Sequence, residues 1–172
     1  MVIVITGVMA AGKSTVAQRL AERLPRSAHI RGDVFRRMIV SGREELLSDE
    51  KAEAVDQLWL RYRLSAATAD AYAAAGFTAI VQDVILGGDL TAYAELIVTR
   101  PRHLVVLAPR PEVVSQREAA RPKAGYGAWT VPDLDRSLRE DTPRTGLWMD
   151  TSDQSPDETV DAIVAGLNLS RS

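Results

Sequence analysis

Short apolar runs alternate along this chain with longer segments whose apolar residues recur at helical spacing. Runs of this length, rich in valine and isoleucine, are typical of strands buried on both faces. We expect strands at 2–6, 29–31, 77–81, 103–107 and 147–150. We expect helices at 13–24, 34–41, 50–75, 90–98, 133–141 and 156–167, with a basic helical stretch at 110–123 and a loop at 124–132. This alternation predicts an α/β fold, a doubly wound parallel sheet with helices on both faces.

Length and composition favour one domain over 1–172. The chain has 172 residues, 46% hydrophobic and 26% charged, which is ordinary for a globular protein. A net charge of -2 gives no electrostatic argument for binding nucleic acid or an anionic membrane. The absence of cysteine excludes disulfides and thiolate metal sites, and two histidines leave little scope for a histidine site. With no leader and no membrane-length apolar run, we expect a cytoplasmic protein.

The chemistry begins at residues 7–15, Gly-Val-Met-Ala-Ala-Gly-Lys-Ser-Thr, between the first strand and the first helix. The stretch fits the phosphate-binding loop pattern of glycine, four residues and Gly-Lys-Ser/Thr. Its glycines let successive backbone N–H groups point into one anion-binding cradle. Lys13 would contact the β- and γ-phosphates, and the Ser14 hydroxyl would ligate Mg²⁺. A chance glycine-rich turn is the alternative, but the flanking strand and helix favour binding of ATP with Mg²⁺. The residues expected to bind the nucleotide are Gly7, Ala10, Ala11, Gly12, Lys13, Ser14 and Thr15.

Asp83 follows the predicted strand 77–81. A carboxylate after a buried strand fits the Walker B arrangement, in which it orients Mg²⁺ directly or through water. Because the carboxyl ends of parallel strands meet at one edge of the sheet, we expect Asp83 and Ser14 to approach one ion. Asp83 thereby also becomes a candidate contact for the substrate. The alternative is a helix or turn cap.

Asp33 follows the short second strand and opens a predicted helix. It could act as a helix N-cap. It could also accept the proton of a substrate hydroxyl that attacks the γ-phosphate, since this strand end would lie beside the phosphate loop. Arg36 and Arg37 in the next turn are candidates for clamping a polar substrate, or one of them is simply a solvated helix position.

The segment at about 110–132 is a candidate lid. Arg117 and Arg121 lie four residues apart, on one helical face, and could neutralise charge on the transferring phosphoryl group. Pro122, Gly125 and Gly127 provide breaks at which a lid could hinge. A solvent-exposed helix, with Glu118 pairing to its neighbours, is the alternative.

Together these motifs resemble the small P-loop kinases, which include shikimate, gluconate and adenylate-type kinases, and most of all the chloramphenicol phosphotransferase family. The likeness rests on residues 11–14, on Asp-Val-Ile-Leu-Gly-Gly at 83–88 and on Arg-Glu-Ala-Ala-Arg at 117–121. It implies a five-stranded parallel sheet in the order 2-3-1-4-5. It also implies that Asp33 is a general base, that Lys13 and Ser14 bind phosphate and magnesium, and that the two lid arginines assist transfer. The segment 34–39, followed by acidic residues, departs from a pocket suited to chloramphenicol.

The function expected is that of an ATP- and Mg²⁺-dependent phosphotransferase acting on a hydroxyl of a small molecule, with antibiotics and other natural products among the candidate acceptors. Arg36 and Arg37 suggest an acceptor with a phosphate, a carboxylate or several polar groups. One alternative is a metabolic kinase of the nucleoside, nucleotide or sugar type. Another is a nucleotide-dependent switch or a zeta-toxin-like effector. Overall acidity counts against a nucleic-acid substrate.

Overall fold

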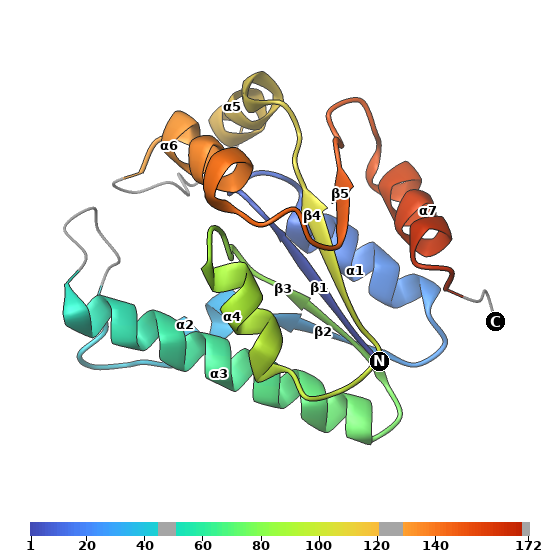
Figure 1. Ribbon diagram of the computed structural model, residues 1–172, viewed down its shortest axis with the longest axis horizontal. Coiled ribbons are helices and arrows are strands. Elements are labelled where there is room, and N and C mark those ends of the chain that lie inside the picture. The colour runs from blue at the N-terminus through green and yellow to red at the C-terminus, as the bar shows by residue number, and fades with distance from the viewer. Residues whose placement is uncertain (45–50, 121–128, 170–172) are drawn as a thin grey trace.

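The protein forms one five-stranded, all-parallel sheet with strand order β2-β3-β1-β4-β5, which confirms the predicted architecture and order. The structure is a computed structural model, and it describes residues 1–44, 51–120 and 129–169. Hydrogen bonds join each pair of neighbouring strands in a parallel register, and Figure 1 shows the strands within the fold. The strands are β1 (Val2–Gly7), β2 (Ser27–Arg31), β3 (Thr78–Gln82), β4 (Arg102–Leu107) and β5 (Leu147–Met149).

Helices cover both faces of this sheet, as Figure 1 shows. The helices are α1 (Lys13–Arg23), α2 (Gly32–Arg37), α3 (Ala52–Ala74), α4 (Asp89–Leu96), α5 (Pro111–Ala119), α6 (Val131–Arg136) and α7 (Pro156–Gly166), with a π-helical turn η1 (Ser137–Asp141). The chain moves from β1 to β2 in one direction across the sheet and from β2 to β3 in the other. Because such crossovers are right-handed, α1 and α3 lie on opposite faces. α7 packs beside α1, and α4 packs beside α3.

The central strand carries the core. Val2, Ile3, Val4 and Ile5 of β1 are fully buried, since helices cover the sheet on either side. This explains why β1 is a continuous apolar run without the alternation of a half-exposed strand. Among the described residues, no helix has both the length and the apolar character needed to cross a membrane.

Several element boundaries differ from those predicted. The helix predicted at 34–41 is the shorter α2, which begins at Gly32 and ends at Arg37. The short helix predicted at 133–141 begins at Val131 and changes to the π-helical turn at Ser137. Thr130 sets this earlier start: its hydroxyl accepts a hydrogen bond from the Asp133 N–H, and the Asp133 carboxylate accepts one from the Thr130 N–H. Of the predicted basic stretch, α5 ends at Ala119, and 121–123 lie outside the described residues.

Candidate active site

The phosphate-binding loop joins the end of β1 to the first turn of α1. Gly12 precedes the helix with φ of +96°, a conformation that side chains rarely adopt. At Gly7 a Cβ atom would lie 2.4 Å from the backbone oxygen of Leu107, so the close approach of β4 requires glycine. Ala10 also has a positive φ, +61°. Such backbone strain is typical of functional sites, and here it shapes the cradle of N–H groups that the sequence predicted.

Lys13 and Ser14 stand at the start of α1. The Lys13 ammonium donates to the Val8 carbonyl at 2.7 Å, and only 8% of the residue is exposed. The Ser14 hydroxyl donates to Oε1 of Gln82 at 3.3 Å. The N-terminal N–H groups of α1 and the helix dipole add to the pull on an anion. This donor set fits the phosphates of a nucleotide, with Ser14 available to Mg²⁺.

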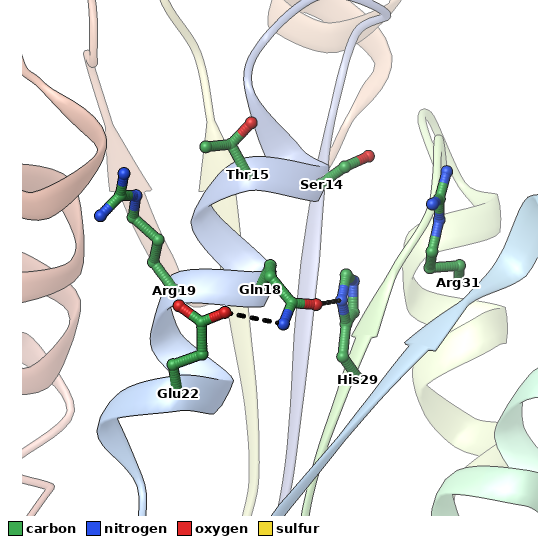
Figure 2. Close-up of a pocket in the computed structure, with 7 residues that line it drawn as sticks. All are labelled: Ser14, Thr15, Gln18, Arg19, Glu22, His29 and Arg31. Atoms are coloured by element: carbon green, nitrogen blue, oxygen red, sulfur yellow. Dashed lines mark hydrogen bonds between the residues drawn. The ribbon is translucent and has the colours of Figure 1, made fainter.

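A pocket of about 470 Å³ opens beside this loop, between α1 and β2 (Figure 2). All of its lining side chains are polar, and Ser14 and Thr15 place its upper end at the phosphate loop. The lining residues are Ser14, Thr15, Gln18, Arg19, Glu22, His29 and Arg31. The predicted nucleotide contact Thr15 is therefore exposed on the pocket wall.

His29 is held in this wall by a short chain of hydrogen bonds. Its Nδ1 lies 2.9 Å from Oε1 of Gln18, whose amide nitrogen donates to Glu22 at 2.9 Å. Since the amide oxygen accepts, Nδ1 carries the proton in the neutral ring. Nε2 is buried and has no hydrogen-bond partner among the described residues. Burial, with a smaller contribution from the Arg31 charge, lowers the pKa of His29.

Asp33 lies in the first turn of α2, directly after β2. Arg31 precedes that helix, and no side-chain hydrogen bond caps it, so Asp33 does not act as the cap. Its Oδ2 is 3.1 Å from Nη2 of Arg37, and its Oδ1 is 3.6 Å from Nε of Arg31. Oδ1 is buried without a hydrogen bond among the described residues. Asp33 thus keeps an acceptor atom for a proton at the carboxyl edge of the sheet.

Asp83 pairs with Arg61, whereas Ser14 contacts the neighbouring Gln82. Side chains alternate between the faces of a strand, so Gln82 and Asp83 at the end of β3 point in opposite directions. Gln82 turns to the face covered by α1 and contacts Ser14. Asp83 turns to the other face and forms a two-pronged ion pair with Arg61 of α3. The expectation that Asp83 and Ser14 approach one Mg²⁺ ion, directly or through water, stays a prediction.

Arg61 is the site residue that the sequence analysis missed. It lies in the long helix α3, 22 residues before its partner, and only 15% of its side chain is exposed. Arginine is common on exposed helix faces, so its position alone carries no signal. Its place beside the strand ends follows only from packing of α3 on β2 and β3.

The remaining predicted arginines occupy different parts of the site. Arg117 of α5 donates to the carbonyl of Ala11 at 3.5 Å and to that of Thr151 at 3.2 Å, so it bridges the phosphate loop and the loop after β5. Arg36 donates to the Glu44 carbonyl at 2.8 Å. Arg121 lies outside the described residues, as does the central part of the predicted lid.

Comparisons with known proteins agree with the fold of this chain. A family model described as an AAA domain, AAA_33, matches residues 2–158. No curated protein sequence matches the chain. Among solved structures, the chain is similar to a sugar kinase from Janibacter sp. HTCC2649 at 20% identity and a TM-score of 0.72, covering 99% of this chain and 95% of that one.

Two further structures are similar over nearly the whole chain. The tunicamycin resistance protein of Deinococcus radiodurans is 19% identical with a TM-score of 0.69, covering 98% of this chain and 96% of that one. A gluconokinase from Sinorhizobium meliloti 1021 is 19% identical with a TM-score of 0.69, covering 96% of this chain and 90% of that one. At these identities the likeness establishes a shared fold, that of small P-loop kinases.

Proposed function

Because the chain belongs to the AAA domain family AAA_33, whose model matches residues 2–158, we propose that it is a phosphotransferase that moves the γ-phosphate of ATP to a hydroxyl of a small molecule. The observation that carries this proposal is that β1, β2 and β3 end close together at the same edge of the sheet. Gln82 of β3 pairs with both Ile5 of β1 and Arg31 of β2. The phosphate loop and Asp33 therefore emerge from the same edge of the sheet, two strands apart.

In the proposed reaction, Asp33 is the general base. The acceptor hydroxyl donates its proton to the Asp33 carboxylate while its oxygen bonds to the γ-phosphorus. The bond between that phosphorus and the oxygen bridging to the β-phosphate breaks, which leaves ADP. Arg37 and Arg31 flank the Asp33 carboxylate and hold it at this edge of the sheet.

On the nucleotide side, Lys13 moves from the Val8 carbonyl to the β- and γ-phosphates. Ser14 would hold Mg²⁺, which when bound neutralises phosphate charge. Arg117, already held against the loop carbonyl of Ala11, would stabilise bound nucleotide, and we assign Arg121 the corresponding role in the lid. The backbone cradle at Gly7 and Gly12 would bind the phosphate oxygens.

The identity of the acceptor is to be determined by experiment. The similar structures include kinases of sugar-like compounds and a protein of antibiotic resistance, and both acceptor classes are candidates here. A screen with Mg-ATP should cover hydroxylated antibiotics, sugars, sugar acids and nucleosides, with product mass as the readout. A gain of one phosphate that requires Asp33 supports the proposal. ATP binding with no transfer to any acceptor would shift the protein to the alternative of a nucleotide-dependent switch.

A further inference from the structure

The charged groups on the acceptor side of the site are already paired with one another. Asp83 lies against Gly32, where a Cβ atom would come within 1.8 Å of its carboxylate oxygen Oδ2. Gly32 is the residue directly before Asp33, and Asp33 and Arg36 both act electrostatically on Arg61. The Arg61–Asp83 ion pair is therefore part of the same cluster as the proposed base.

Both oxygens of the Asp83 carboxylate are engaged in this cluster. It accepts hydrogen bonds from Nε of Arg61 at 2.7 Å, from Nη2 of Arg61 and from the Val84 N–H at 2.7 Å. Only 2% of its side chain is exposed. A metal ion at Asp83 would have to share the carboxylate with a buried guanidinium or displace it, and displacement would leave that charge unpaired in a poorly solvated position.

The ion pair with Asp83 occupies only part of the hydrogen-bond donors of Arg61. Nε and Nη2 face Asp83, whereas the two N–H groups on Nη1 have no hydrogen-bond partner among the described residues. The side chain keeps 15% of its surface exposed. Arg61 thus presents spare donors whose positive charge is cancelled by the carboxylate behind them.

The other arginines of this edge are also engaged. Arg31 and Arg37 face Asp33, and Arg36 binds the Glu44 carbonyl. An acceptor that carried a carboxylate or phosphate here would have to compete with these partners. A neutral hydroxyl or carbonyl oxygen needs only a donor, which Nη1 supplies.

We propose that Arg61 is a specificity-determining residue that donates from Nη1 to a neutral oxygen of the acceptor, and that Asp83 is the positioning residue that cancels its charge and so disfavours anionic acceptors. This inference rests on the proposed phosphotransferase function and narrows its substrate class to neutral, oxygen-rich compounds. Of the acceptors suggested by Arg36 and Arg37, those with a phosphate, a carboxylate or several polar groups, it favours the last.

The test compares acceptors that differ only in one charged group: D-glucitol with D-gluconate, methyl shikimate with shikimate, and thymidine with thymidine 3′-phosphate. For every pair that the protein phosphorylates, we expect kcat/KM to favour the neutral member by about tenfold or more, because an uncompensated charge is costly at a poorly solvated site. In Asp83→Asn this preference should fall by about tenfold, through a lower KM for the anion. Arg61→Gln should raise KM for the neutral member without favouring the anion.

The outcomes separate the two proposals. If the wild-type protein prefers the anionic members of the pairs, the inference about Arg61 and Asp83 is overturned while the proposed phosphotransferase function stands. This measurement does not depend on the folding of a variant. An Asp83→Asn protein with normal ATP affinity and an unchanged preference also overturns it. Absence of transfer to every member of every pair, with Lys13-dependent ATP binding intact, overturns the proposed function, and the inference falls with it.

Discussion

At the scale of single residues, Asp33 is the most informative side chain in the site. Its carboxylate has arginines on two sides, and one oxygen is buried without a hydrogen bond among the described residues. The oxygen without a hydrogen bond could accept a proton, which is the role that we propose for Asp33. A helix cap would instead have bonded to the backbone of its own helix, which Asp33 does not do.

Replacement of Asp33 tests this assignment. Asp33→Asn keeps the shape of the side chain but removes the base, so we expect phosphoryl transfer to fall by about 10²–10⁴-fold while ATP affinity changes little. Turnover and calorimetric ATP binding would measure the two effects. Asp56→Asn, on the exposed side of α3, is the matched control and should behave as the wild type. Unchanged turnover in Asp33→Asn would remove Asp33 from the mechanism.

Lys13 tests the nucleotide half of the site. Its ammonium is buried and hydrogen-bonded within the loop, poised to transfer to a phosphate. Lys13→Ala should lower turnover by at least about 10²-fold and weaken ATP binding, because it removes the charge that stabilises the phosphates in the ground state and during transfer. The rise in Tm on adding Mg-ATP should shrink in parallel. A full Tm rise together with normal turnover would refute the assignment of this loop.

His29 gives the protein a pH-dependent stability. Its pKa is lower in the folded protein than the ordinary 6.5, because burial, and then the Arg31 charge, disfavour the imidazolium. The unfolded chain therefore binds the proton more readily, so this contribution is fully present above about pH 6.5 and is lost as pH falls toward the folded pKa.

We expect the free energy of unfolding, measured by urea denaturation, to fall from pH 7.5 to 5.5 more steeply in the wild type than in His29→Gln. Equal slopes in the wild type and His29→Gln would contradict the effect of burial on this ring.

At the scale of elements, the strands were the most predictable part of the molecule. Their apolar runs follow directly from burial on both faces, and the order 2-3-1-4-5 came from the resemblance to P-loop kinases. Boundaries that depend on local hydrogen bonds were less accessible. The start of α6 is fixed by Thr130 and Asp133, a capping box that the sequence contains but that the aromatic and glycine residues before it obscured.

That capping box makes a prediction about stability. Thr130→Ala removes the hydroxyl that accepts from Asp133, and we expect the free energy of unfolding to fall by about 1 kcal/mol. Ser155→Ala breaks the equivalent box of α7 and should cost about the same, which makes it a useful reference. Urea denaturation of both variants would measure this. A loss confined to Ser155→Ala would show that α6 does not depend on its cap.

The ion pair between Asp83 and Arg61 could not be predicted from the sequence, because it depends on side-chain direction and on helix packing. Side-chain direction reverses with each residue along a strand. Which of Gln82 and Asp83 faces Ser14 therefore depends on the register of β3 in the sheet, to within one residue. The predicted end at residue 81 was one residue short of the observed Gln82. Pairing with Arg61 then required knowledge of how α3 lies on the sheet.

At the scale of the whole molecule, the fold assembles the site from three separate stretches of chain. The ends of β1, β2 and β3 bring the phosphate loop, Asp33 and Asp83 to one edge, while α3 supplies Arg61 behind them. Arg117 joins α5 to this edge through the Ala11 and Thr151 carbonyls. The α/β architecture thereby places the phosphate loop, which follows β1, on one side of β3 and Asp33, which follows β2, on the other.

The measurement that tests this account most directly is phosphoryl transfer from Mg-ATP to a panel of hydroxylated small molecules, followed by mass spectrometry of the acceptors in wild type and Asp33→Asn. We expect the wild type to add one phosphate to at least one acceptor, and Asp33→Asn to lose that product while still binding ATP. Equal product from both proteins, or bound ATP with no phosphorylated acceptor in any class, would contradict a phosphotransferase built around Asp33.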